Sequence, residues 1–167
     1  MADTSLLVIL DDSAASKRAV KYVGKIVGKR KGIRIFLLHV LPPLPPELVE
    51  HGGSENPGKE ARLDVDQKAE QNRWISIANK ASQKRLDEAR ALLRIAGVST
   101  GTVKGLTCEP GGNQDAADVI LYMARECKCR TIVVGRESVA WFQKLFNEQL
   151  ADELHRRGIE FTVWAIE

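Results

Sequence analysis

Cysteines and long apolar runs are both scarce in this sequence of 167 residues. The three cysteines, Cys108, Cys127 and Cys129, are an odd and sparse set that is typical of free thiols. No apolar stretch approaches the ~18 residues that a membrane-spanning helix needs. Residues 1–5 lack the basic and apolar regions of a secretory signal peptide. The sequence therefore predicts a cytoplasmic protein without a membrane partner.

An excess of one charge is also missing. The 25 Lys and Arg residues oppose 22 Asp and Glu residues, which gives a net charge of +3, and both signs are spread along the chain. The densest basic run, residues 29–31 with Arg34, lies where the first helix should end, so we interpret it as complementing the helix dipole rather than as a phosphate-binding patch. No nucleic-acid partner is expected.

The motifs of catalytic and metal sites are absent as well. The sequence contains no GxxxxGK[ST], GxGxxG, GxSxG or HExxH pattern. The histidines His39, His51 and His155 have no ligand spacing. Cys127 and Cys129 form a Cys-x-Cys pair without a second pair, so we interpret Cys127 as a core residue and Cys129 as incidental. The protein is expected to be no enzyme and to hold no metal.

Continuous apolar runs alternate with helical apolar spacing along the whole chain. Ser13 is placed to cap the first helix, Asn113 to cap the third, and Gly97 to end the second. The alternation predicts a single three-layer α/β domain over residues 1–167, with a parallel sheet and helices on both faces. Strands are expected at 6–10, 35–41, 98–106, 131–134 and 161–166, and the longest helix at about 66–95.

The longest helix is expected to bury one apolar face along its full length. That face would contain Trp74, Ile77, Ala78, Ala81, Leu86, Ala89, Leu93 and Ala96.

An insertion at about 42–62 separates the second strand from this helix. It begins with a stiff proline-rich exit at 42–46, which we favour over a docking motif for a proline-recognising partner. Residues 51–60 are rich in Gly, Asn, Pro and charge, which is typical of a mobile segment.

A candidate site follows from position alone, because ligands of open parallel sheets lie beyond the carboxyl ends of the strands. The first strand ends in residues 11–13, Asp-Asp-Ser, and the fourth ends in residues 135–138, Gly-Arg-Glu-Ser. If these strands are neighbours, the two loops face one crevice. The alternative is that residues 11–13 only cap a helix and Gly135 only turns the chain, and the sequence leaves both readings open.

Several motifs in order resemble the universal stress protein family, which has an adenine-nucleotide alpha-hydrolase-like fold. They are residues 10–16, Leu-Asp-Asp-Ser-Ala-Ala-Ser; His39-Val40 followed by prolines; and residues 131–135, Thr-Ile-Val-Val-Gly. The resemblance covers essentially the whole chain. It implies a five-stranded sheet of order 3-2-1-4-5 and a dimer formed through the last strand. In the nucleotide-binding branch, it implies that Asp11 and Val40 hold adenine and ribose.

The sequence departs from the family's ATP pattern, a Gly-x-x-Gly followed after nine residues by Gly-Ser or Gly-Thr. Gly135 keeps the first place, while Ser138, Glu148 and Gln149 occupy the other three, and Asp12 replaces the glycine after the first-strand Asp. The alternative for Glu148 is that it points to water as a first-turn acid of the last helix. The resemblance thus implies a degenerate ATP motif, with Asp11, Val40, Gly135 and Ser138 as the nucleotide-binding candidates.

The expected function is that of a non-catalytic homodimer that acts in stress response through contacts with an unidentified protein. No cofactor is expected, and ATP binding should be weak or absent. The alternative is a sensor that binds ATP or AMP in the retained part of the site.

The dimer is predicted from the character of the last strand. Phe161, Val163, Trp164 and Ile166 make it apolar on both faces, and a two-fold partner would cover such an edge. The alternative is a monomer in which the last helix and the longest helix cover Trp164 and Ile166.

We expect Mg-ATP to bind no more tightly than roughly 100 μM, a free energy of about −5.5 kcal/mol. Glu148 and Gln149 stand where glycines admit a triphosphate, and a carboxylate ~4 Å from one phosphate charge costs on the order of 4 kcal/mol at an effective dielectric of ~20. The double change Glu148→Gly with Gln149→Ser should therefore raise the affinity measured by calorimetry. An unchanged affinity would move the defect to Asp12 or Ser138. A low-micromolar constant for the unmodified protein, or ATP that co-purifies with it, would contradict the prediction.

Overall fold

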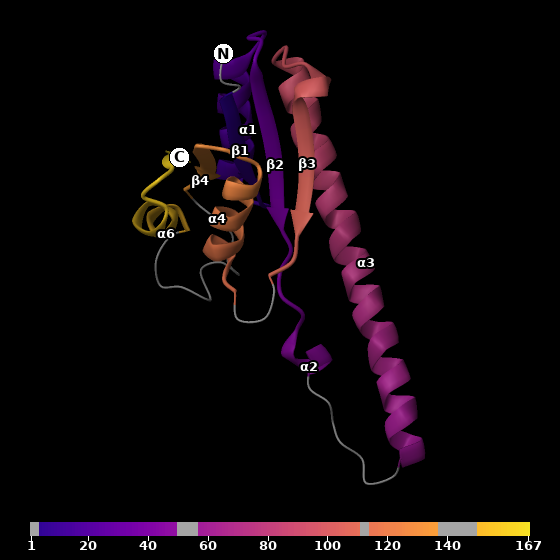
Figure 1. Cartoon of the computed structure of the whole chain (residues 1–167). Helices are drawn as coiled ribbons and strands as arrows, with labels where there is room; N and C mark the ends of the chain where they lie inside the picture. Colours follow the sequence, from indigo (N-terminus) through magenta and orange to yellow (C-terminus); the bar gives the residue numbers. More distant parts are fainter. Residues whose placement is uncertain (1–3, 50–56, 111–113, 137–149) are drawn as a thin grey trace.

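Five parallel strands form one sheet in the order β3-β2-β1-β4-β5 (Figure 1). The computed structural model describes residues 4–49, 57–110, 114–136 and 150–167. The three-layer fold and the strand order 3-2-1-4-5 are therefore confirmed. The strands are β1 (Thr4–Leu10), β2 (Ile33–Val40), β3 (Val103–Cys108), β4 (Thr131–Gly135) and β5 (Thr162–Ile166).

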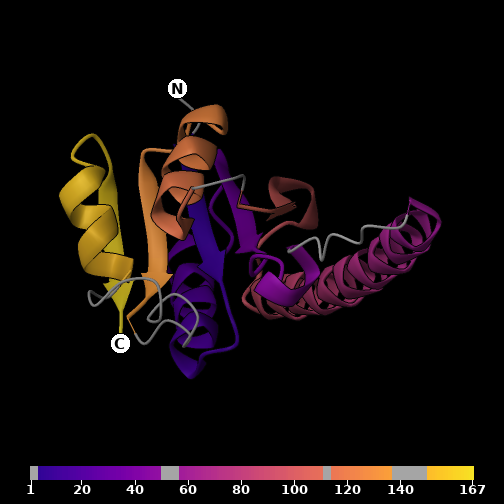
Figure 2. The same ribbon diagram turned by 90° about the horizontal axis from the view of Figure 1, so that it is seen from below.

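Helices cover both faces of this sheet (Figure 2). Buried side chains of α1 and α3 pack on one face, and those of α4 and α6 pack on the other. This division follows from right-handed crossovers, which place the connections left and right of β1 on opposite faces. The helices are α1 (Ala14–Val27), α2 (Pro46–Val49), α3 (Pro57–Ile95), α4 (Ala116–Glu126) and α6 (Leu150–Arg157), with a 3₁₀ turn η1 (Thr100–Thr102) before β3.

Strand β1 shows why the sequence has continuous apolar runs. Leu6, Val8 and Leu10 belong to the core under α1 and α3, while Leu7 and Ile9 belong to the core under α4 and α6. A strand that is covered on both faces needs apolar side chains at every position.

Helix α1 begins where the sequence places its cap. The Ser13 hydroxyl accepts a hydrogen bond from the Ser16 N–H at 3.0 Å, which satisfies one free donor of the first turn. Gly24 lets α1 approach α3 closely, because a Cβ there would lie 2.8 Å from the Cβ of Ala96. The two helices that flank the cavity described below are therefore held at a short distance.

Helix α3 is longer than expected and only half of it lies on the sheet. It begins at Pro57 rather than at about 66. Its 39 residues span about 58 Å at 1.5 Å per residue, whereas the longest strand has 8 residues and spans about 26 Å. Both views show the amino-terminal half extending past the sheet (Figures 1 and 2).

The prediction that α3 buries one apolar face along its full length is therefore wrong for its first half. Leu86, Ala89 and Leu93 are buried, but the side chain of Ile77 is 62% exposed. Trp74, Ala78 and Ala81 are only partly buried. The apolar spacing continues beyond Leu86 toward the amino terminus, but none of the described strands lies beneath it there.

The segment before α3 supplies the main contacts to its projecting half. The side-chain amides of Gln67 and Gln71 donate to the backbone carbonyl of Leu48 at 3.1 and 2.5 Å. Within the expected insertion at 42–62, α2 and the first residues of α3 are helical. Residues 50–56 lie outside the described part of the chain.

Two smaller expectations about elements need correction. Strand β3 starts at Val103 rather than at 98, because η1 precedes it. Helix α4 is capped by Asp115, whose carboxylate accepts from the Asp118 N–H at 2.8 Å. Asn113, the expected cap, lies outside the described residues.

The roles of two cysteines are the reverse of those expected. Cys129 is 2% exposed, whereas Cys127 is only half-buried. Lys128 adopts a left-handed φ of 53°, and the N–H groups of Lys128 and Cys129 bond to the carbonyls of Arg125 and Ala124. This is a Schellman motif, which turns the residue after the left-handed position back onto its helix.

Burial raises the pKa of the Cys129 thiol to about 12, so it stays protonated at neutral pH. Among the residues that the structure describes, no group of His, Cys, Asp and Glu side chains is arranged to hold a metal ion. None of the described helices is long and apolar enough to cross a membrane.

Two substitutions on the same helix test how α3 is divided. Leu93→Ala should lower the free energy of unfolding by about 2–5 kcal/mol because it leaves a core cavity. Ile77→Ala should lower it by less than ~1 kcal/mol, because that side chain faces water. Urea unfolding of both variants measures the difference. Equal losses would show that the first half of α3 is packed after all.

Candidate functional site

The carboxyl ends of β1 and β4 meet at the point where the sheet changes winding direction. The two strands are parallel neighbours, with Leu6 opposite Thr131 and Val8 opposite Val133. The carboxyl ends of β1 and β4 therefore lie side by side, as the strand order requires. This arrangement brings Asp11 close to Gly135.

Gly135 is required by close packing at this point. A Cβ on it would lie 2.6 Å from the backbone carbon of Ala15 and from the backbone nitrogen of Ser16. The end of β4 thus lies directly against the first turn of α1. This contact gives Gly135 a structural role, whether or not a ligand also uses the close approach.

Asp11 holds the turn that leads into α1. Its carboxylate accepts from the Ser13 N–H at 2.7 Å, and its own N–H donates to the Ser16 hydroxyl at 3.1 Å. The residue is partly buried at the end of β1. Asp11 therefore orders this turn, and the turn fixes its position at the end of β1.

The other candidates are placed differently. The side chain of Val40 is 1% exposed and belongs to the core under α4 and α6. Ser138 lies outside the described residues, as do Glu148 and Gln149, so the degenerate ATP motif remains a prediction. The structure brings Asp11 and Gly135 to one point and keeps the Val40 side chain in the core.

Helix α3 contributes a residue that the sequence did not suggest. Arg85 forms a two-pronged ion pair with the carboxylate of Asp12, with its Nε 2.5 Å from one oxygen and its Nη2 on the other. A third nitrogen of the same guanidinium lies 3.3 Å from Nε2 of His39. Asp12 and Arg85 are 73 positions apart, so only the fold reveals the pair.

His39 is neutral in this setting. Its residue is 5% exposed, and burial, with the nearby Arg85 charge, lowers its pKa to about 4 although Asp12 acts in the opposite direction. Since a guanidinium can only donate, Nε2 must accept and the proton resides on Nδ1. That Nδ1 is buried and has no hydrogen-bond partner among the described residues.

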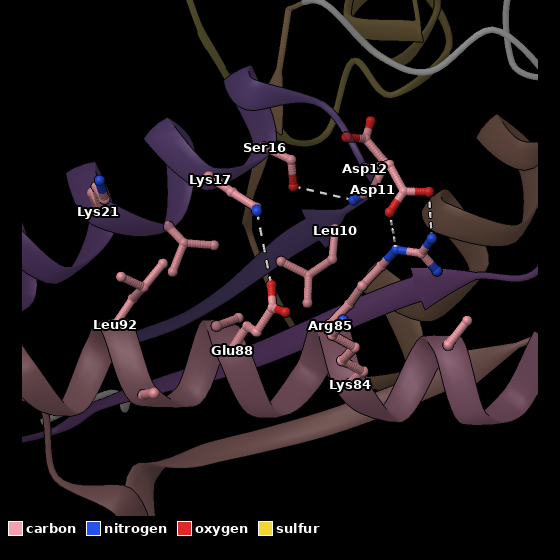
Figure 3. Close-up of a pocket in the computed structure, with 14 residues that line it drawn as sticks. Leu10, Asp11, Asp12, Ser16, Lys17, Lys21, Lys84, Arg85, Glu88 and Leu92 are labelled. Atoms are coloured by element: carbon pink, nitrogen blue, oxygen red, sulfur yellow. Dashed lines mark hydrogen bonds and ion pairs between the residues drawn. The ribbon is translucent and has the colours of Figure 1, made fainter.

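A cavity of about 640 Å³ opens between α1 and α3 beside Asp11 and Asp12 (Figure 3). Two ion pairs cross it from one wall to the other: Asp12 with Arg85, and Lys17 with Glu88 at 3.8 Å. Its lining offers charged and apolar groups for binding. Ser16, the hydroxyl residue of the lining, accepts from the Asp11 N–H at 3.1 Å and donates to the Ile9 carbonyl at 3.4 Å.

Comparison with known proteins agrees with this architecture. The sequence profile described as the universal stress protein family matches residues 4–157. The chain belongs to the universal stress protein family. No individually curated protein matches it at a significant level.

Solved universal stress proteins share its fold at low sequence identity. The protein from Burkholderia pseudomallei is 18% identical, with 99% of this chain and 96% of that chain covered and a TM-score of 0.58. A universal stress protein in complex with cAMP is 17% identical, with 100% and 98% covered and a TM-score of 0.59. The protein from Archaeoglobus fulgidus in complex with dAMP is 16% identical, with both chains fully covered and a TM-score of 0.55.

Asp12 is the expected departure from the ATP pattern that lies within the described residues. Its carboxylate joins the end of β1 to α3 through Arg85. The side chain of Asp12 is 63% exposed and that of Arg85 is 23% exposed. The pair therefore lies at the mouth of the site rather than in the core.

The lowered pKa of His39 makes the stability of the fold depend on pH. The unfolded chain, with a pKa near 6.5, takes up a proton before the folded chain with a pKa of about 4, so stability is full above pH 6.5 and falls toward pH 4. Between pH 7.5 and 5.0 we expect a loss of roughly 1–2 kcal/mol from this residue. Urea unfolding of the wild type and of His39→Gln should show that the variant loses less. An identical loss in both would contradict the prediction.

Proposed function

We propose that this universal stress protein is a non-catalytic homodimer that acts in stress response through protein contacts and binds ATP weakly or not at all. The observation that supports it is the character of β5 at the edge of the sheet. Within the described residues no other strand covers its outer side.

Strand β5 and the residue just before it carry apolar side chains toward both faces of the sheet. Phe161 and Val163 pack against the core under α4 and α6, while Trp164 and Ile166 pack against the core under α1 and α3. All four are only partly buried. The rings of Trp164 and Tyr22 meet edge to face with centroids 6.4 Å apart, so α1 rather than the longest helix covers the tryptophan.

The backbone of β5 is open toward solvent at alternate residues. The Thr162 N–H donates to the carbonyl of Arg130, and the Ile166 carbonyl accepts from Arg136, both at 2.8 Å. These groups point to β4, and backbone polarity alternates along a strand, so the N–H and carbonyl groups of Val163 and Ala165 point to the free edge. Residues 162–166 contain no charge or proline that would block pairing.

Exposed apolar side chains flank this edge. Tyr22 is 44% exposed beside Trp164, and Ile159 is 88% exposed just before the strand. A two-fold partner that added its own β5 would pair the open backbone of both copies and cover part of this surface.

Weak ATP binding is supported by the charges at the end of β1. Asp11 and Asp12 place two carboxylates at this point, and Arg85 is already paired with the more exposed of them, that of Asp12. Repulsion between a carboxylate and a triphosphate grows with the charge of the ligand.

The second candidate function is that of an adenine-nucleotide sensor. It is supported by the relatives solved with cAMP and with dAMP, and by the position of Asp11 beside Gly135. A ligand with one phosphate would meet less repulsion than ATP. Nucleotide released by heat from the purified protein, identified by mass and absorbance, separates the two candidates.

Proline substitutions at two neighbouring positions of β5 test the dimer. Light scattering of the wild type should give about twice the 18.5 kDa of one chain. Ala165→Pro removes an N–H that points to the free edge, so it should yield a folded monomer with a melting temperature close to that of an undimerised wild-type subunit. A wild-type monomer at tens of micromolar, or a dimer that survives Ala165→Pro, would refute the arrangement.

Trp164→Pro is the matched control for that measurement. It removes an N–H that points inward to β4, so it should destabilise the subunit itself rather than only its association.

A further inference from the structure

The cavity between α1 and α3 includes only one of the nucleotide-binding candidates. Asp11 lines it, but neither Val40 nor Gly135 does. Its walls are the exposed sides of two helices that pack on the same face of the sheet (Figure 3). A ligand held here would therefore contact α3, which the nucleotide candidates do not include.

The floor of this cavity is apolar. It is formed by Leu10, Val20 and Ala89, each less than 5% exposed, together with the partly buried Leu92 and Ala81. Its volume of about 640 Å³ falls in the range of roughly 300–1,000 Å³ that small-molecule sites occupy. The cavity therefore accommodates the body of a small organic molecule.

Arg85 gives the cavity a fixed recognition group for a carboxylate. Its guanidinium already binds one carboxylate through two parallel contacts, that of Asp12. This two-pronged geometry is the one that arginine uses for planar carboxylates. Arg85 is the more buried partner and also contacts His39, whereas Asp12 is mostly exposed and free to turn toward water.

The remaining charges of the cavity favour a ligand with one negative charge. Lys17 is paired with Glu88, while Lys21 and Lys84 form no ion pair with any described residue. Two unpaired cations attract an anion. The carboxylates of Asp11 and Glu88 stay close by, and they would repel a dianion more than a monoanion.

We propose that this cavity binds a small organic carboxylate, with its apolar body on the floor and its carboxylate on Arg85 in place of the Asp12 side chain. Asp12 then acts as a tethered competitor that keeps the arginine paired when the ligand is absent. An exposed ion pair of this kind is weak, so a free carboxylate is able to displace it.

A matched pair of ligands tests the assignment on the full-length protein. The probes are 2-naphthoate and 2-naphthamide, which share one aromatic body and differ in charge. Calorimetry or ligand-observed NMR should show that the wild type binds the acid at least fivefold more tightly than the amide. Rising salt concentration should weaken the binding of the acid and leave the binding of the amide unchanged.

Three variants identify the residues responsible. Asp12→Asn removes the competing carboxylate. It should therefore raise the affinity for 2-naphthoate about threefold and leave the affinity for 2-naphthamide unchanged. Arg85→Gln should abolish the preference for the acid. Arg94→Gln lies on the same helix and outside the cavity, so it should behave as the wild type.

The Asp12→Asn result keeps the test decisive if Arg85→Gln proves unstable, because it predicts a gain of binding in a folded protein. Equal binding of acid and amide by the wild type and by Asp12→Asn would overturn the proposal. So would the absence of binding by both proteins at millimolar probe, or a preference for the acid that survives in a folded Arg85→Gln.

Discussion

Strand β1 has neither an exposed face nor a free edge, and this confinement determines where the rest of the chain can lie. It pairs with β2 on one side and β4 on the other, and the side chains from Leu6 to Leu10 are all buried. Residues 6–10 accordingly carry no polar side chain, and a cluster of polar residues follows where the chain leaves the sheet. Asp11, Asp12 and Ser13 stand at that exit, and they form the capping turn, the ion pair to α3 and the edge of the cavity.

The sheet was predictable because its signals are local. Each buried strand leaves an uninterrupted apolar run, and a resemblance to known sequences supplied the order of the strands. Helix α3 shows the limit of local signals. Its apolar spacing continues through Ile77 just as through Leu93, but the spacing records which face of a helix is apolar and not whether a sheet lies beneath it. The burial of Cys129 was not predicted either, because the left-handed conformation of Lys128 reverses the direction of the side chain that follows it.

The site was predictable only where it depended on strand ends. Asp11 and Gly135 meet because neighbouring parallel strands end at the same edge, a rule that sequence order and topology supply. The contribution of α3 had no such signal. Arg85 is one of several charged residues on a long amphipathic helix, and nothing near it in the sequence marks it as the partner of Asp12 and His39. Asp12 was visible in the sequence at the end of a strand, but its pairing with an arginine on the opposite wall of the cavity was not.

The projecting half of α3 also changes how the molecule moves through solvent. Residues 57–76, about half of the helix, extend about 30 Å, which gives the particle a larger frictional coefficient than a sphere of the same mass. Its Stokes radius will exceed that of a compact protein of 18.5 kDa. A single chain will therefore leave a gel-filtration column earlier than a compact protein of the same mass.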